Sequence, residues 1–220
     1  MYRTLAAAVL AVVAASAYAS DQRTATLEAS FPPGKAGAAS AVELHMTWAD
    51  PGEPAGKPQS LHLLRLDFPP GTKINTAALP RCRATNKRIA KRGPSACPRR
   101  TRLGTGESLL TSGQQQLAAK IVLINARRQI IVVVRVGKST LAVYRDTVAG
   151  STVTVHFALP PSLSLLDLSI HIPVHVRGRR VYFSTPPPCP ADGLWHMTAT
   201  SSYADGSTQQ AQAAAACTGA

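Results

Sequence analysis

Acidic and aromatic residues are scarce in this 220-residue chain. It contains 11 Asp and Glu residues against 24 Lys and Arg residues, and only 5% of its residues are aromatic. The few carboxylates are scattered, so none are spaced to suggest the acid and base of a glycosidase. The formal net charge of +13 instead predicts attraction to polyanions, such as nucleic acid, anionic lipid or acidic wall polymer.

Familiar catalytic and cofactor motifs are also missing. There is no G-x-S-x-G nucleophile elbow, and Gly104-Thr-Gly106 has neither the third glycine nor the following helix of a nucleotide-binding loop. His171 and His175 form the one close histidine pair, but on an extended strand they would lie roughly 13 Å apart, too far to share a metal. We therefore expect no catalytic residue, metal or other cofactor. A secreted hydrolase with an unrecognised active site stays open as the alternative.

Long apolar runs are confined to the N-terminus. The uncharged run 5–15 follows Arg3 and ends in Ala17-Tyr18-Ala19. A charged start, a short apolar middle and small residues at the end are typical of a secretory signal peptide, whereas a membrane anchor needs about 20 apolar residues. We expect cleavage after Ala19, leaving one secreted domain, residues 20–220. Losing Arg3 leaves 23 basic and 11 acidic residues, a net charge of +12.

Four cysteines lie in this expected mature domain: Cys82, Cys97, Cys189 and Cys217. In an oxidising compartment an even number predicts two disulfides, for which three pairings are possible. We favour Cys82–Cys97 and Cys189–Cys217, because each pair is close in sequence and lies in one local unit. No two cysteines are near enough for the C-x₂₋₄-C pairs of a zinc site.

Alternating apolar and polar residues predict short β-strands along most of the chain. The pattern is regular in residues 42–48 and 168–176, where Pro173 indicates an edge strand or a bulge. The segment 125–128 predicts a turn, led by Asn125, between two apolar runs at the centre of a sheet. Asp205-Gly206 predicts a hairpin within 189–217 that would return the chain to Cys189.

These patterns together predict a fold class. We expect an all-β, single β-sandwich-like domain. A small, cysteine-closed insertion, residues 81–102, would interrupt it, with a short helix over about 84–91 because this segment has no β-branched run before Gly93-Pro94.

Two cysteine-containing stretches carry a resemblance. The first is Phe68-Pro-Pro-Gly-Thr-Lys-Ile-Asn-Thr-Ala-Ala-Leu-Pro-x-Cys82, followed by Ala96-Cys97-Pro98 and Gly104-Thr-Gly106. The second is Cys189-Pro-Ala-Asp-Gly-Leu-Trp195 with Tyr203-Ala-Asp-Gly206 and Cys217. Together they resemble a group of uncharacterised secreted proteins of high-GC actinobacteria, over roughly residues 61–217. The resemblance implies export, two disulfides and a β-rich fold, and it brings no catalytic residue.

Positive charge is concentrated in residues 81–102, which hold nine basic residues and no acidic one. On a helix, Arg83, Lys87 and Lys91 would share one face, beside Arg88 and Arg92. A Cys82–Cys97 disulfide would hold this charge in a compact protrusion. The residues expected to contact an anionic surface are Arg83, Lys87, Arg88, Lys91, Arg92, Arg99 and Arg100.

The expected partner of this insertion is anionic wall polymer or a membrane surface, bound with a steep dependence on salt. No aromatic residue is interleaved for base stacking, so specific nucleic-acid binding is not expected. Two alternatives stay open: a solvated face that keeps an exported protein soluble, and a purely structural domain.

Overall fold

A computed structural model describes residues 23–53, 57–112, 115–160 and 162–219 of this chain, so the expected leader, residues 1–19, lies outside the described residues. Eleven strands form one antiparallel sheet: β1 (Thr24–Ser30), β2 (Val42–Ala49), β3 (Leu61–Asp67), β5 (Arg102–Ser112), β6 (Gln115–Ala126), β7 (Gln129–Val136), β8 (Ser139–Ala149), β9 (Thr152–His156), β10 (Leu163–Ile172), β14 (Leu194–Tyr203) and β15 (Thr208–Ala216). Their order is β1-β2-β10-β5-β6-β7-β8-β9-β3-β14-β15.

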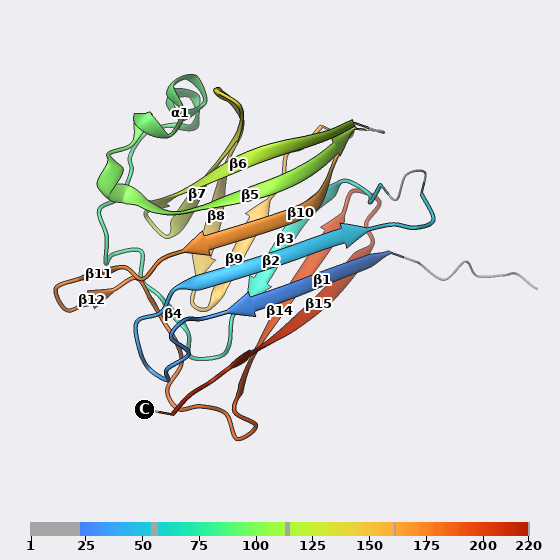
Figure 1. The fold of residues 1–220 in the computed structure, drawn as a ribbon. Helices are drawn as coiled ribbons and strands as arrows, with labels where there is room; N and C mark the ends of the chain where they lie inside the picture. The colour runs from blue at the N-terminus through green and yellow to red at the C-terminus, as the bar shows by residue number, and fades with distance from the viewer. Residues whose placement is uncertain (1–22, 54–56, 113–114, 161, 220) are drawn as a thin grey trace, which may run out of the picture.

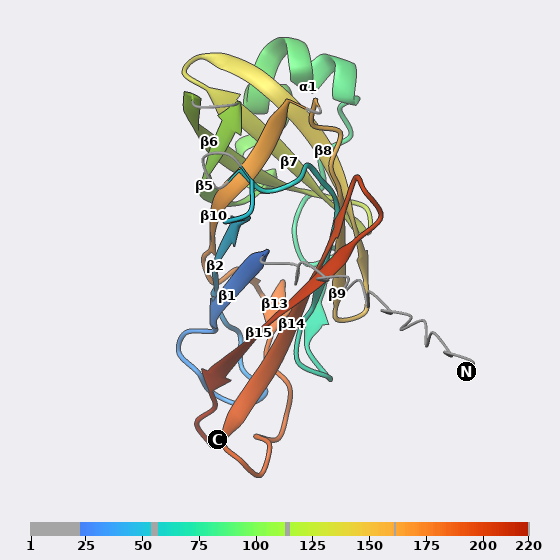
Figure 2. The same cartoon turned by 90° about the vertical axis from the view of Figure 1, so that its right-hand side faces the viewer.

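The sheet curls on itself, so that its two edge strands, β1 and β15, lie beside each other (Figure 1). In Figure 2 strands β1, β2, β10 and β5 form one wall and β8, β9, β3 and β14 form the other. Apolar side chains from both walls fill the space between them, in one large buried cluster that includes Trp48, Leu64 and Trp195. The expected all-β, sandwich-like domain is confirmed, built from one continuous sheet rather than two separate ones.

The remaining elements are short. Two small antiparallel sheets pair β4 (Lys73–Ile74) with β13 (Phe183–Ser184) and β11 (Val176–Arg177) with β12 (Arg180–Val181). One α-helix, α1 (Asn86–Arg92), is followed by the 3-10 turns η2 (Gly93–Ala96) and η3 (Arg99–Thr101). No helix in the described part of the chain has both the length and the apolar character to cross a membrane.

Strand β2 shows how the alternating pattern fixes the two faces of the sheet. Val42, Met46 and Trp48 are 1–3% exposed and face the core, whereas Glu43 is exposed and His45 half-buried on the outer face. This is the arrangement that the alternation predicts, because successive side chains of a strand point to opposite faces.

Strand β10 differs from the prediction. It ends at Ile172, one residue before Pro173, and it lies between β2 and β5 rather than at an edge. Because Pro173 follows the last paired residue, its missing N–H group removes no bond from the sheet. The apolar alternation continues to Val176, which belongs to the separate hairpin β11–β12.

Two glycines allow β5 to lie against β10. A Cβ atom built on Gly104 would overlap the carbonyl oxygen of His171, and one on Gly106 would overlap that of Ser169. The Gly104-Thr-Gly106 sequence therefore serves the close approach of two strands.

The continuous apolar run of β7 is buried on both faces. Ile130, Val132 and Val134 face the main core, while Ile131 and Val133 point the other way into a second buried cluster with Ile89 of α1. The cysteine-closed insertion is thus packed onto the outer face of β6–β8 and is not a free protrusion. The basic side chains of α1 remain exposed: Lys87, Arg88, Lys91 and Arg92.

The helix is shorter than predicted. It begins at Asn86, where the hydroxyl of Thr85 accepts a hydrogen bond from the Arg88 backbone N–H (3.3 Å) and caps the first turn. Arg83 precedes the helix, so it does not share a helical face with Lys87 and Lys91 as predicted.

Both disulfides are confirmed. Cys82 is bonded to Cys97 across the insertion, and Cys189 to Cys217 at the base of the C-terminal hairpin. That hairpin turns at the predicted Asp205-Gly206 and places Leu194 opposite Ala216, so the alanine-rich tail is a strand.

Candidate functional site

Six exposed arginines surround one open cleft of about 1140 Å³, which we call the arginine cleft. The cleft lies where four connections meet: the loop before α1, turn η3, the β6–β7 turn and the β11–β12 hairpin. Its other lining residues are Cys82 and the segment 77–80. The six residues are Arg81, Arg83, Arg100, Arg127, Arg177 and Arg180.

No carboxylate offsets this charge. The cleft lining contains no Asp or Glu, and within the described residues none of the six arginines forms an ion pair. Arg81 is positioned by a hydrogen bond that its Nε donates to the Thr76 carbonyl (3.1 Å). Guanidinium groups bind carboxylates and phosphates in a bidentate manner, so the cleft is chemically suited to an anion with several such groups.

The loop that carries Arg81 and Arg83 is fixed from beneath by Asn125. This side chain is fully buried, and its Nδ2 donates hydrogen bonds to the carbonyls of Thr76, Leu79 and Pro80 (3.0–3.1 Å). The backbone carbonyl of Asn125 in turn accepts a hydrogen bond from the Cys82 backbone N–H (2.8 Å). Asn125 is therefore not the turn residue that the sequence suggested. The turn consists of Arg127 and Arg128, and Arg128 has a φ of 53°.

The structure separates the basic residues predicted to act together. Arg83 and Arg100 lie in the arginine cleft, whereas Lys91 and Arg92 line a second depression with Arg102, Arg135 and Lys138. Lys87, Arg88 and Arg99 are exposed outside both hollows.

Sequence reasoning predicted an anion contact for Arg83 and Arg100 and missed the other four cleft arginines, Arg81, Arg127, Arg177 and Arg180. The turns that hold Arg127, Arg177 and Arg180 lie about 45 to 100 residues further along the chain than the loop before α1. The available signal was arginine in predicted turns, as in Arg127-Arg128 and Arg177-Gly-Arg-Arg180. Nothing in a linear pattern places these turns beside one another.

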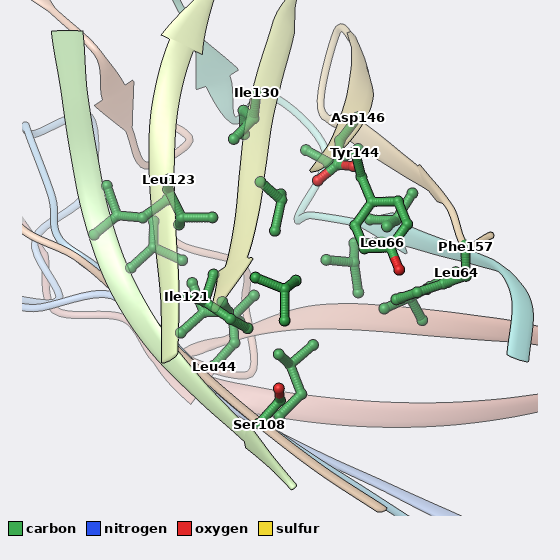
Figure 3. Close-up of a pocket in the computed structure, with 18 of the residues that line it drawn as sticks. Leu44, Leu64, Leu66, Ser108, Ile121, Leu123, Ile130, Tyr144, Asp146 and Phe157 are labelled. Carbon is green, nitrogen blue, oxygen red and sulfur yellow. The ribbon is translucent and has the colours of Figure 1, made fainter. Parts of the chain in front are cut away.

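A second feature lies inside the sandwich. A cavity of about 110 Å³ runs between the two walls and is lined by 25 residues, nearly all of them apolar. Figure 3 shows Tyr144 and Asp146 of β8 among apolar side chains such as Leu64, Leu66 and Ile130. The side chains at 144, 146 and 148 face inward because they alternate along one strand.

Three polar atoms at this cavity have no hydrogen-bond partner: Asp146 Oδ1, Tyr144 Oη and Tyr182 Oη. Asp146 is only 4% exposed, and burial raises the pKa of its carboxyl well above the usual range. Burial, and secondarily the nearby Asp146, raises the pKa of Tyr144 to about 12. Burial also raises the pKa of Tyr182 above its usual range.

A third feature is a shallow hollow on the outer face of β1, β2, β10 and β5, where histidines meet carboxylates. His45 Nε2 lies 2.7 Å from Asp167 Oδ2, and this hydrogen bond raises the pKa of His45. His171 Nδ1 lies 3.5 Å from Glu43. His175 is elsewhere, with Nε2 2.6 Å from the Leu103 carbonyl.

The histidine–carboxylate hollow also contains a serine, Ser169. Ser169 is the partner of His45 in the strand register, but the two side chains make no hydrogen bond to each other in the described structure. Among the described residues there is no group of three or more His, Cys, Asp or Glu side chains that could hold a metal ion. No protein-family model, curated protein or solved structure matches this chain.

Proposed function

We propose that this chain is an exported, non-catalytic protein that binds an anionic polymer of the cell envelope, with the arginine cleft as the centre of binding. One observation carries the proposal: six arginines from four separate connections converge on one cleft without a carboxylate among them. Like charges repel, so such a cluster lowers the stability of the free protein unless an anion neutralises it.

The shape of the cleft favours a polymer with repeated anionic groups. Several guanidinium groups around a concave surface can contact successive phosphates or carboxylates of one chain, and each contact releases bound counterions. The exposed basic residues of α1, Lys87, Arg88, Lys91 and Arg92, would extend the attraction beyond the cleft.

Export is supported by the chemistry of the cysteines. All four are paired in disulfides, which persist in oxidising compartments and are rare in the cytosol. Together with the leader-like sequence of residues 1–19, this supports a secreted or cell-surface location, where anionic wall polymers are the accessible partners. The same features are what the resemblance to secreted actinobacterial proteins implies.

A secreted hydrolase is the competing hypothesis, and it would depend on the His45–Asp167 pair. Replacing His45 by Gln would abolish such an activity and leave anion binding unchanged. We favour anion binding, because six arginines around one cleft without a carboxylate are a more specific observation than a single His–Asp pair.

The test measures binding of the oxidised protein to long-chain polyphosphate over a series of salt concentrations. In the cleft variant Arg127, Arg177 and Arg180 are all replaced by Gln. The matched control replaces Lys87, Arg88 and Lys91 by Gln, which removes the same charge from α1. Each lost contact with a B-DNA phosphate flattens the plot of log K against log salt by about 0.9, so the cleft variant should lose about 2–3 in slope.

The two variants separate the cleft from general charge. We expect the control to retain most of the slope. Equal losses in both variants would mean that net charge, not the cleft, determines binding. If the unaltered protein bound vesicles containing phosphatidylglycerol but not polyphosphate, the partner would be a lipid surface and the polymer proposal would be wrong.

A further inference from the structure

Anion binding at the surface leaves the interior cavity unexplained. The cavity lies between the walls of the sandwich, and 25 residues line its volume of about 110 Å³. Protein interiors are normally packed as densely as organic crystals, with few voids larger than a water molecule. A void of this size in the centre of the core is therefore unusual.

The polar groups at the cavity are as unusual as its volume. Asp146 Oδ1, Tyr144 Oη and Tyr182 Oη are all buried without a hydrogen-bond partner. A buried polar group without a partner costs about 1–3 kcal/mol, and native structures tolerate only a few. Here three such groups line one apolar cavity: two belong to β8 and the third, Tyr182, comes just before β13.

We propose that this cavity binds a small, neutral, mostly apolar molecule that carries one oxygen function, a hydroxyl or a carbonyl, and that the unpartnered carboxyl of Asp146 or hydroxyl of Tyr144 forms a hydrogen bond with that oxygen. Ligand pockets have this composition: apolar walls with a few placed polar groups that fix the orientation of the ligand.

The chemistry of the walls selects a neutral ligand. Burial raises the pKa of the Asp146 carboxyl well above its usual range, which favours the protonated form that can both donate and accept a hydrogen bond. A charged ligand would have to leave water for an interior with no basic side chain among the lining residues, which is strongly unfavourable.

The volume limits the ligand to about one ring or a short branched chain. An engineered, dry cavity of about 150 Å³ in another protein accommodates benzene. A cavity of 110 Å³ is somewhat smaller, so a ligand with one ring requires small adjustments of the lining side chains. This inference is independent of the arginine cleft, because none of the cleft residues lines the cavity.

Phenol and toluene are the probes, because they have nearly the same shape and differ in a hydroxyl against a methyl group. Binding to the oxidised protein is followed by NMR through the methyl signals of cavity residues such as Ile121, Leu123 and Ile130. A hydroxyl that finds no partner in an apolar cavity costs about tenfold or more in affinity. We expect phenol to bind the unaltered protein at least as tightly as toluene, because its hydroxyl reaches Asp146 or Tyr144.

Two variants test the role of the polar groups. In Asp146→Leu, which keeps a side chain of similar size, the affinity for phenol should fall about tenfold relative to toluene. Tyr144→Phe should give a smaller loss in the same direction. The ratio of the two affinities is the readout, so a general change in stability does not mimic the effect.

Three results would overturn the proposal. Phenol binding that is much weaker than toluene binding in the unaltered protein would show that the polar groups do not serve a ligand oxygen. An affinity ratio that Asp146→Leu leaves unchanged would exclude Asp146 as the partner. Failure of both probes to shift the cavity methyl signals would show that the space is closed to ligands or holds only water.

Discussion

Replacing Asp146 by Asn should change how the stability of the protein depends on pH. Burial raises the pKa of this carboxyl in the folded protein, whereas in the unfolded chain it is solvated and ionises in the usual range near 3.8. Between these two pKa values the folded state holds a proton that the unfolded state has lost. Rising pH therefore favours unfolding in this window, and Asn, which does not titrate, removes the effect.

The magnitude follows from the linkage between proton binding and folding. One proton held only by the folded state lowers the free energy of unfolding by about 1.4 kcal/mol for each pH unit. Below the ordinary pKa of Asp both states are protonated and the penalty is absent. The stability of Asp146→Asn relative to the unaltered protein should therefore rise by about 1.4 kcal/mol per pH unit above about pH 4, until the pKa of the folded protein is reached.

Urea denaturation at a series of pH values measures this difference. Other titrating groups contribute equally to both proteins, so they cancel when one curve is subtracted from the other. Asp67→Asn is a control of opposite sign, because the ion pair with Arg65 (2.8 Å) lowers the pKa of Asp67. Stability from that pair is present above the usual pKa of Asp and is lost as the pH falls. A difference curve for Asp146→Asn that is flat with pH would refute the buried, neutral carboxyl.

Two further changes probe how the insertion is held. Asn125→Ala removes the two N–H donors that are shared among the loop carbonyls at 76, 79 and 80. At about 1 kcal/mol for each donor, the free energy of unfolding should fall by about 2 kcal/mol in urea denaturation, and a loss below about 0.5 kcal/mol would mean that the loop is held by other contacts. The double replacement Cys82→Ser/Cys97→Ser opens a loop with a sequence separation of 15 residues and should cost about 3 kcal/mol in the same assay, whereas an unchanged denaturation midpoint would contradict that estimate.

Local patterns in the sequence predict the strands and hairpins of this fold well. The alternation in residues 42–48, the turn at Asp205-Gly206 and both disulfides are all found as predicted. These features depend on neighbours within one strand or one hairpin, where side-chain period and turn chemistry are sufficient. The all-β fold class follows from the same local signals.

Features that depend on long-range pairing could not be predicted in this way. Strand β10 pairs with β2 and β5, which are more than 100 and more than 50 residues earlier in the sequence. The interpretation of Pro173 as an edge strand or a bulge was wrong because the strand ends at Ile172, before the proline. Asparagine is common in turns, but Asn125 is buried under the loop before α1, and its hydrogen bonds to that loop override the preference for a turn. The arginine cleft is hidden for the same reason, since the connections that hold its residues flank β10, β5, β6 and β7, which become neighbours only through long-range pairing.

The arginines of the cleft have one property in common: none of them belongs to the eleven-stranded sheet. They lie in loops, in a 3-10 turn and in the small β11–β12 hairpin, while the disulfides and the buried cluster hold the scaffold. Surface connections tolerate substitution far better than packed strands do. The charge and shape of the cleft can therefore diverge, or be redesigned, by exchanging residues in these turns without repacking the core.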